Sequence, residues 1–337
     1  MRFPWKLTTA TMALGLALAA CAPETDDGPT ADVEDDANGD DNGEATADAS
    51  GESVTLVANL WPGSMANVQI AAHVLREELG ADAEVVEIDE NAAWTGLDSG
   101  EYDAVLELWL SGHEDNYAQY VEDIGSVEDI GEIGVVGEIG WFIPQYVLDE
   151  YPEMETWEGL EGNEDIFATA ETGDAGRFLA ADPSFVQFDE TIIDNLGLNL
   201  EVVQSGSESA QLAEVQTALD NEDPVLFYFY TPHWMHERYA LAQVALPEYE
   251  ENCGEPEDER TCGYPEERML KIVNADLSEN APVSYEFLSA FQMENEWQDE
   301  ITFMMADEGE GMSPEEAAEQ WVEDNPDVVE EWLNAIS

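Results

Sequence analysis

Basic residues are scarce in this 337-residue chain, which contains 8 Lys+Arg against 79 Asp+Glu and has a formal net charge of −71. A phosphate backbone would be repelled by such a chain, so nucleic acid is excluded as a partner. Concentrated salt screens repulsion between carboxylates, and we interpret the acidity as adaptation of the surface to high salt. A wholly disordered acidic protein is excluded, because 44% of the residues are hydrophobic and periodic apolar segments run from residue 54 onward.

Long apolar runs are also missing, and the only apolar stretch at the N-terminus is too short for a transmembrane helix. Residues 1–20 combine Arg2, Lys6 and an apolar core, which predicts a signal peptide. The ending Leu-Ala-Ala-Cys resembles a bacterial lipobox, so we expect Cys21 to be lipidated and to be the first mature residue; ordinary cleavage with an incidental Cys21 is the alternative. Residues 22–52 lack aromatic and basic side chains, and we expect 21–52 to be the lipidated cysteine and a disordered acidic tether.

Cysteine is rare as well, with three in the chain. Once Cys21 is assigned to the lipid, Cys253 and Cys262 remain in the polar loop CGEPEDERTC. An exported protein lies in an oxidising space, so we expect these two to form a disulfide. A metal pair is the competing interpretation, although no second pair of ligands lies nearby.

Motifs of common enzymes are absent from the sequence. His233 and His236 are three residues apart without an HExxH pattern, and neither a G-x-S-x-G elbow nor a phosphate loop is present. We therefore expect no metal, no cofactor and no enzymatic activity. An exported carbohydrate hydrolase is the main alternative from another class, but it requires two opposed carboxyl groups and no such pair stands out.

Strand-like and helix-like segments alternate from Ser53 onward, which predicts an α/β protein with mainly parallel sheets. We expect a helix over 64–80 with Ser64 as its N-cap and Gly80 as its end, a crossing segment over 137–148, a strand over 166–171 and helical residues over 178–184. The other expected strands are 53–61, 83–88, 102–110, 200–205 and 224–230, and the other expected helices are 92–100, 207–221, 281–291, 298–307 and 313–337.

Aromatic residues gather where these strands end. Trp61 and Trp109 each end a strand, Tyr228 and Tyr230 end another, and Trp141 lies in the crossing segment. Ligands of open α/β sheets bind beyond the carboxyl ends of strands. Several ring faces suit a quaternary ammonium ion, which has no N–H to donate and binds instead by cation–π contact.

A carboxylate at the other end of such a ligand would need hydrogen-bond donors. We expect His233 to supply one, and main-chain N–H groups near Ser64, Met65, Gly173 and Asp174 to supply others. Core packing is about as probable as ligand contact for any single one of these rings. We assign the remaining tryptophans to the core and His113 and His236 to surface or capping positions; these tryptophans are Trp94, Trp157, Trp234, Trp297, Trp321 and Trp332.

The segments VLELWLSGHEDNY, GWFIPQYV, ETGDAG, SGSESAQLAEVQTAL and YTPHWMHERYALAQVALPEY resemble the substrate-binding proteins of glycine betaine/choline ABC importers, over nearly all of residues 54–337. By this resemblance Trp61, Trp109, Trp141 and Tyr230 correspond to aromatic-box positions, and His233 to a carboxylate-binding position. Relatives usually carry tryptophan where this chain has Tyr230. The loop with Cys253 and Cys262 resembles that of a subset of the family with a disulfide there.

The resemblance implies two hinge-connected α/β lobes of the periplasmic-binding-protein type II class. We expect lobe I to comprise 53–142 and 238–337, and lobe II to comprise 143–237. It further implies a monomeric receptor on the extracytoplasmic face of the cell membrane. This receptor captures a quaternary ammonium ligand, glycine betaine foremost, and delivers it to ABC permease subunits. A choline or proline-betaine receptor is the alternative within the family.

Overall fold

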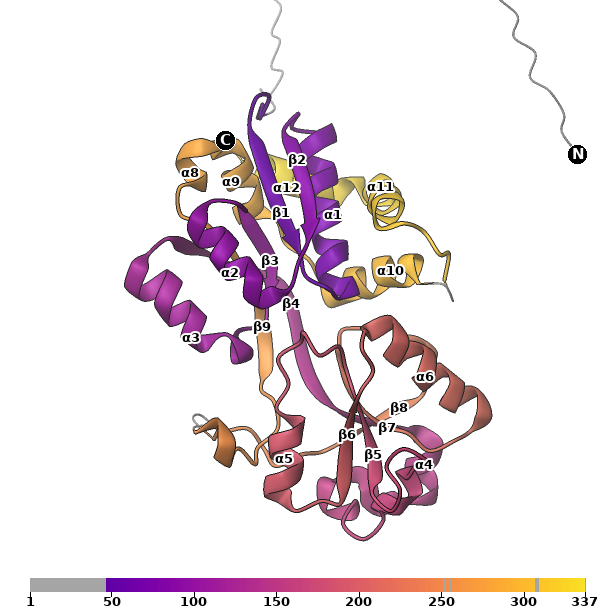
Figure 1. Ribbon diagram of the computed structural model, residues 1–337. Helices are drawn as coiled ribbons and strands as arrows, with labels where there is room; N and C mark the ends of the chain where they lie inside the picture. The colour runs from indigo at the N-terminus through magenta and orange to yellow at the C-terminus, as the bar shows by residue number, and fades with distance from the viewer. Residues whose placement is uncertain (1–46, 251–252, 255, 307–308, 337) are drawn as a thin grey trace, which may run out of the picture. The chain divides into compact units, whose positions relative to one another are not determined.

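The computed structural model describes residues 47–250, 253–254, 256–306 and 309–336 (Figure 1). The predicted signal peptide, Cys21 and the tether up to residue 46 lie outside these residues. Residues 47–52, assigned to the tether, contact the folded part of the chain at two points: Ala49 is fully buried, and the Glu52 carboxylate accepts the backbone N–H groups of Val283 and Ser284. These contacts shorten the predicted tether at its C-terminal end.

The first lobe is built on three parallel strands, β1 (Ser53–Ala58), β2 (Asp82–Glu87) and β3 (Ala104–Leu108). Residue alternation in β1 gives the sheet two buried faces: Leu56 packs in the cluster with helix α1 (Pro62–Glu77), and Val57 packs in the cluster with Trp94 of α2 (Glu90–Ser99). A short α3 (Glu114–Tyr117) follows β3.

The C-terminal helices return to the α1 face of this lobe (Figure 1). They are α8 (Leu277–Asn280), α9 (Pro282–Ala290), α10 (Asn295–Met305), α11 (Pro314–Asp324) and α12 (Pro326–Asn334). Trp321 and Trp332 stack at 6.0 Å in this core, which confirms their predicted packing role.

The second lobe is built on parallel strands β5 (Gly176–Ala180), β6 (Leu200–Gln204) and β7 (Leu226–Thr231), with β5 between the other two. Its helices are α4 (Gln145–Glu150), α5 (Asp189–Leu196), α6 (Glu208–Asn221) and α7 (Met235–Arg238). A separate hydrophobic cluster centred on Phe178, Phe227 and Phe229 forms its core.

Two long antiparallel strands connect the lobes, β4 (Val127–Pro144) and β9 (Glu266–Asn274) (Figure 1). The nine-stranded sheet has the order β2-β1-β3-β9-β4-β7-β5-β6, and β8 (Leu241–Val244) pairs with the end of β4. Ala242, Val244 and Tyr264 pack in the second cluster, so the chain returns to the first lobe along β9 rather than at residue 238. The predicted α/β class is confirmed, but the sheet is mixed because the crossing strands are antiparallel.

Three local predictions are wrong. Helix α1 begins at Pro62 with Trp61 as N-cap, because proline fits the first turn of a helix; the Ser64 hydroxyl instead accepts the N–H of Asn59. Residues 164–167 form a 3₁₀ turn instead of a strand. Residues 176–180 form strand β5 instead of a helix, because Phe178 and Leu179 are buried and paired with strands on both sides.

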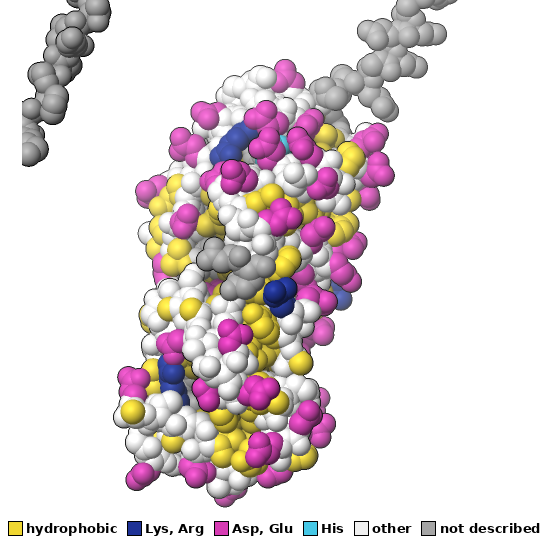
Figure 2. Space-filling view, turned by 90° about the vertical axis from the view of Figure 1, so that its right-hand side faces the viewer, with side chains coloured by type: hydrophobic (Ala, Val, Ile, Leu, Met, Phe, Trp, Pro, Cys, Tyr) yellow, Lys and Arg dark blue, Asp and Glu magenta, His cyan; other side chains and the backbone are white. Residues whose placement is uncertain are grey.

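Figure 2 shows Asp and Glu side chains spread over the visible face, with only isolated Lys and Arg among them. The charged side chains on this face of the folded chain are therefore mainly acidic.

Candidate functional site

A pocket lies between the two lobes, at the carboxyl ends of the strands. Its lining comprises Trp61, Glu90, Trp109, Ser111, Gly112, His113, Ile139, Phe185, Val186, Phe188, Tyr228 and Tyr230. The sequence-predicted residues Trp61, Trp109, Tyr228 and Tyr230 are therefore brought together. Among the described residues that line this pocket, none is Lys or Arg, and six of the twelve are Trp, Phe or Tyr.

Both pocket tryptophans follow neighbouring parallel strands. Trp61 comes shortly after β1 and caps α1, and Trp109 directly follows the last residue of β3. Since β1 and β3 are paired in parallel, their carboxyl ends meet at one edge of the sheet. The parallel pairing of β1 and β3 therefore brings Trp61 and Trp109 to the same edge of the sheet.

Glu107 holds the two indole rings from behind. One oxygen, Oε1, accepts the indole N–H of Trp61 at 2.6 Å and that of Trp109 at 3.1 Å, while Oε2 accepts from Asn67 Nδ2 at 2.7 Å. The side chain is fully buried, and this burial raises the pKa of Glu107 to about 7, against the lowering effect of the three donors. The sequence analysis missed Glu107, although its position two residues before Trp109 on a strand places both side chains on one face.

The opposing wall comes from β7. Tyr228 and Tyr230 line the pocket, while Phe227 and Phe229 point into the core of the second lobe, as strand alternation predicts. The ring of Tyr230 meets that of Trp109 edge to face, with centroids 5.9 Å apart and an interplanar angle of 81°.

A third part of the wall is the loop between β5 and α5, which begins within the residues 178–184 that were predicted to be helical. Phe185 from this loop meets Trp61 edge to face at 5.5 Å and 88°, and Val186 and Phe188 complete the surface. Recognising β5 would have placed Phe185 just beyond a strand end, where the other pocket rings lie. The wrong element assignment concealed it.

The lobes contact each other beside the pocket. The Val186 backbone N–H donates to Glu90 Oε1 at 2.9 Å, and Glu90 Oε2 lies 3.0 Å from His113 Nε2. Gly112 packs against Val186 so closely that a Cβ at Gly112 would stand 2.7 Å from the Val186 side chain. The expectation of a surface or capping role for His113 is wrong, because its ring is only 2% exposed and lies between Glu90 and Trp94.

His233 lies behind Tyr230, outside the pocket lining. Its Nδ1 accepts the backbone N–H of Met235 at 3.2 Å, so Nδ1 carries no proton, and its Nε2 lies 3.2 Å from Glu208 Oε1. The Tyr230 hydroxyl donates to the same Glu208 oxygen at 3.0 Å. The single N–H of a neutral His233 ring is therefore directed at Glu208 in this conformation.

The other predicted site residues lie away from the pocket lining. Trp141 is fully buried on β4, where its indole N–H donates to Asp189 Oδ1 at 2.6 Å and its ring packs on Phe178. Ser64 is fully buried in the first turn of α1, with Met65 beside it. Gly173 and Asp174 form an exposed turn ahead of β5, at the amino end of that strand, whereas the pocket lies beyond strand carboxyl ends.

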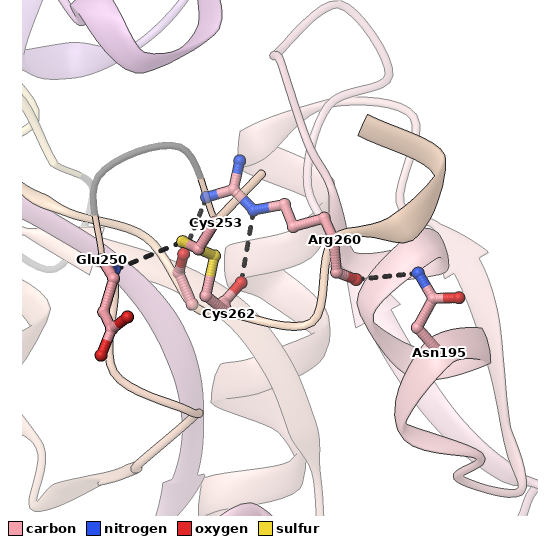
Figure 3. The surroundings of a disulfide bond; sticks show 6 residues. Asn195, Glu250, Cys253, Arg260 and Cys262 are labelled. Atoms are coloured by element: carbon pink, nitrogen blue, oxygen red, sulfur yellow. Dashed lines mark hydrogen bonds between the residues drawn. A yellow bond between two sulfur atoms is a disulfide. The ribbon is translucent and has the colours of Figure 1, made fainter. Parts of the chain in front are cut away.

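The loop that carries the remaining two cysteines supports the pocket wall. Cys253 and Cys262 form a disulfide, as predicted (Figure 3). Arg260, which lies within the loop, donates to the backbone carbonyl of Gly263 at 2.7 Å. The Arg260 guanidinium lies 4.1 Å from the ring centroid of Phe188, on the ring that lines the pocket. The loop is tied to α5 by Asn195, whose side chain donates to the Arg260 carbonyl at 2.9 Å (Figure 3).

Within the described ranges, no group of three or more His, Cys, Asp or Glu side chains is arranged to hold a metal ion. Over the same residues, no helix has both the length and the apolar character needed to cross a membrane.

Known proteins resemble this chain in sequence and in fold. One curated relative, the glycine betaine/carnitine transport binding protein GbuC of Listeria monocytogenes, is 28% identical over 134 residues, which cover 40% of this chain and 40% of the relative. The lactococcal OpuAC structure, closed and complexed with glycine betaine, has a TM-score of 0.66 at 22% identity, covering 84% of this chain and 99% of that one. An ABC-transporter choline binding protein in complex with choline has a TM-score of 0.68 at 22% identity, covering 85% and 92%.

The similarities to solved structures establish the two-lobed fold. The sequence match to GbuC covers less than half of that protein. The family model for the substrate binding domain of ABC-type glycine betaine transport systems matches residues 52–324, which is most of the folded chain. With rings from both lobes facing one pocket, and with that family model covering both lobes, the chain belongs to the substrate-binding domains of ABC-type glycine betaine transport systems.

Proposed function

We propose that this protein is an extracytoplasmic receptor that captures a quaternary ammonium solute, glycine betaine foremost, and delivers it to the permease subunits of an ABC importer. The observation that carries the proposal is the convergence of Trp61, Trp109, Phe185 and Tyr230 on one pocket between the lobes. Each ring face contributes about 0.5–2 kcal/mol to binding a desolvated cation. Family membership supports the transport role.

Closure of the lobes would complete the site. Trp61 and Trp109 belong to the first lobe and Tyr230 and Phe185 to the second, so a ligand between them gains contacts from both sides only when the lobes approach. Such a ligand shifts the equilibrium toward the closed form by its differential affinity for that form. We further propose that lipidation of Cys21 keeps the receptor at the membrane, that it acts as a monomer without catalytic activity, and that the acidic surface serves in concentrated salt.

Choline is the second candidate, and a specific observation favours it. The described lining includes one acidic residue, Glu90, and no Lys or Arg, and the N–H of His233 is directed at Glu208. A zwitterion would bring its own carboxylate into this acidic surrounding, whereas choline carries a hydroxyl group that can donate to a carboxylate.

Calorimetric titration in molar NaCl tests the proposal with glycine betaine, choline, proline betaine and carnitine, and with tetramethylammonium as the bare cation. Saturable binding of at least one quaternary ammonium ligand, together with no binding of glycine or a disaccharide, is expected. Binding of tetramethylammonium and choline without glycine betaine would make choline the preferred solute. Absence of binding by all five quaternary ammonium compounds would overturn the receptor proposal.

A further inference from the structure

Glu107 is the polar group shared by the two pocket tryptophans. Its Oε1 accepts both indole N–H groups, at 2.6 Å from Trp61 and 3.1 Å from Trp109. An indole ring turned about its Cβ would lose this bond, so one oxygen atom restricts the orientation of both rings. Asn59, which directly follows β1, also holds this residue in place, because its side chain donates to the backbone carbonyl of Glu107 at 3.2 Å.

The carboxylate is also enclosed without a cationic partner. Glu107 is fully buried, and within the described part of the chain its carboxylate accepts from three neutral donors, on Trp61, Trp109 and Asn67, and from no Lys or Arg. All three donors favour the ionised form, although burial raises the pKa of Glu107 to about 7. A buried charge with neutral partners retains much of its desolvation cost until an opposite charge arrives.

We propose that Glu107 is the positioning residue of the cation site: it orients both tryptophan faces toward the pocket and supplies the buried negative charge that a captured quaternary ammonium ion compensates. The inference rests on the proposed function, because it assigns a role in binding that same class of ligand. A negative group bonded to the N–H edge of an indole also polarises the ring and strengthens its face as a cation acceptor.

Other titratable groups surround the pocket, and the test must separate them from Glu107. Glu90 projects from α2, His113 from the segment after β3, and Tyr228 and Tyr230 from β7. Five more titratable residues lie outside the lining: Glu208 of α6, His233, Tyr264, Glu267 of β9 and Asp189. The Glu267 carboxylate accepts the backbone N–H and the hydroxyl of Ser111, and Asp189 accepts the indole N–H of Trp141. A comparison of Glu107→Gln with the parent protein leaves all of them in place.

Asp189→Asn provides a matched control. Asp189 is likewise a buried carboxylate that accepts an indole N–H, from Trp141 at 2.6 Å, but neither residue lines the pocket. The Asp189→Asn variant thus removes a buried carboxylate that is bonded to an indole N–H, as Glu107→Gln does, but at a position outside the pocket lining. Glu107→Asp, which shortens the side chain but keeps its charge, separates charge from reach.

The experiment measures the affinity of the full mature chain for tetramethylammonium, choline and glycine betaine by calorimetry at pH 8 and pH 5.5, with folding checked by thermal unfolding. Because ligand charge favours ionised Glu107, parent affinity should fall as pH drops through about 7. For Glu107→Gln we expect at least a tenfold loss at pH 8, a smaller loss at pH 5.5, and an altered ligand-induced change in tryptophan fluorescence. Asp189→Asn should stay within about twofold of the parent protein, since neither Asp189 nor its partner Trp141 lines the pocket.

The outcomes distinguish this inference from the proposed function. A parent protein that binds no quaternary ammonium ion would overturn both. A parent protein that binds, combined with a folded Glu107→Gln variant of equal affinity at pH 8, would overturn the role of Glu107 alone. A loss that is the same at both pH values would reduce Glu107 to a packing role, and would also contradict the inference.

Discussion

The backbone N–H of Val186 donates to the Glu90 carboxylate at 2.9 Å, and this bond joins the loop before α5 in one lobe to the start of α2 in the other. Both residues line the pocket, and Gly112 allows Val186 to approach. The contact forms only when the lobes are together. Glu90 therefore lines the pocket and also stabilises the closed arrangement of the two lobes.

Glu90→Ala should weaken ligand binding by about fivefold, because one interlobe hydrogen bond of roughly 1 kcal/mol is removed from the closed form. The dissociation rate should account for the change, and stopped-flow fluorescence measures it. Glu90→Gln keeps an oxygen that can accept from Val186 and is the matched control for the bond. If both variants release ligand at the parent rate, the bond plays no part in closure.

Trp109→Ala should reduce the affinity for any quaternary ammonium ligand by at least about tenfold, since a cation–π face and its packing are both lost. Calorimetry on the folded variant measures this change. Trp157→Ala is a suitable comparison, because Trp157 packs beside the second lobe core and is absent from the pocket lining. Equal affinities of Trp109→Ala and the parent protein would remove Trp109 from the site.

His233→Ala should weaken glycine betaine and choline by similar factors, about fivefold each. The reason is that the His233 ring lies near the Glu208 oxygen that also accepts from Tyr230, so its loss loosens Tyr230 whatever the ligand carries at its other end. Parallel titrations with the two ligands provide the measurement. A loss confined to glycine betaine would instead mean that the ring turns to meet the ligand carboxylate.

Replacing Cys253 and Cys262 by serine should lower the free energy of unfolding by roughly 2–3 kcal/mol, because a short closed loop in the unfolded chain is released. Denaturant unfolding in high salt measures the change. Because Arg260 within this loop stacks on Phe188, ligand affinity should fall as well. Arg260→Gln, with the disulfide intact, isolates that second effect; unchanged affinity in both variants would separate the loop from the pocket.

Asp189 provides a pH-dependent prediction for stability. Burial raises the pKa of Asp189 from 3.8 to about 6, against hydrogen bonds from Trp141 and Tyr264 that lower it. Between these two values the folded state holds a proton that the unfolded state has released, so the free energy of unfolding attributable to Asp189 falls as pH rises from 3.8 to about 6.

Asp189→Asn removes this titration. The difference in unfolding free energy between variant and parent should therefore grow in favour of the variant with rising pH, by on the order of 2 kcal/mol across that window. Denaturant titrations of both proteins at several pH values measure it. A difference that stays constant with pH would show that Asp189 titrates alike in both states.

The position of aromatic residues at the ends of strands predicted which rings meet at the pocket. Trp61, Trp109, Tyr228 and Tyr230 each follow or end a strand that the apolar pattern predicts, and all four line the pocket. The same argument failed for Phe185, because β5 was interpreted as a helix. Phe178 and Leu179 occur in a short run whose period does not separate strand from helix, and only pairing with β6 and β7 decides between them.

Donor positions were harder to predict than rings. Gly173 and Asp174 form a turn as their composition indicates, but the turn precedes β5 and lies at the wrong end of that strand. His233 follows a strand end as expected, yet its nitrogens lie beside Met235 and Glu208. Hydrogen-bond partners far apart in the chain are set by packing, and no spacing in the sequence records them.

Local sequence pattern was sufficient to predict the alternation of strands and helices and the rings at strand ends, because each depends on residues close together in the chain. It was also sufficient to predict the disulfide, because Cys253 and Cys262 were the two cysteines left once Cys21 was assigned to the lipid. The mixed sheet, the Glu90–Val186 contact and the carboxylate shared by Trp61 and Trp109 emerged only from the folded arrangement. These features join residues separated by tens of positions, and their geometry depends on how two lobes and three neighbouring strands pack. Burial then changes the chemistry of Glu107, one carboxylate among 79 acidic residues that the sequence does not distinguish.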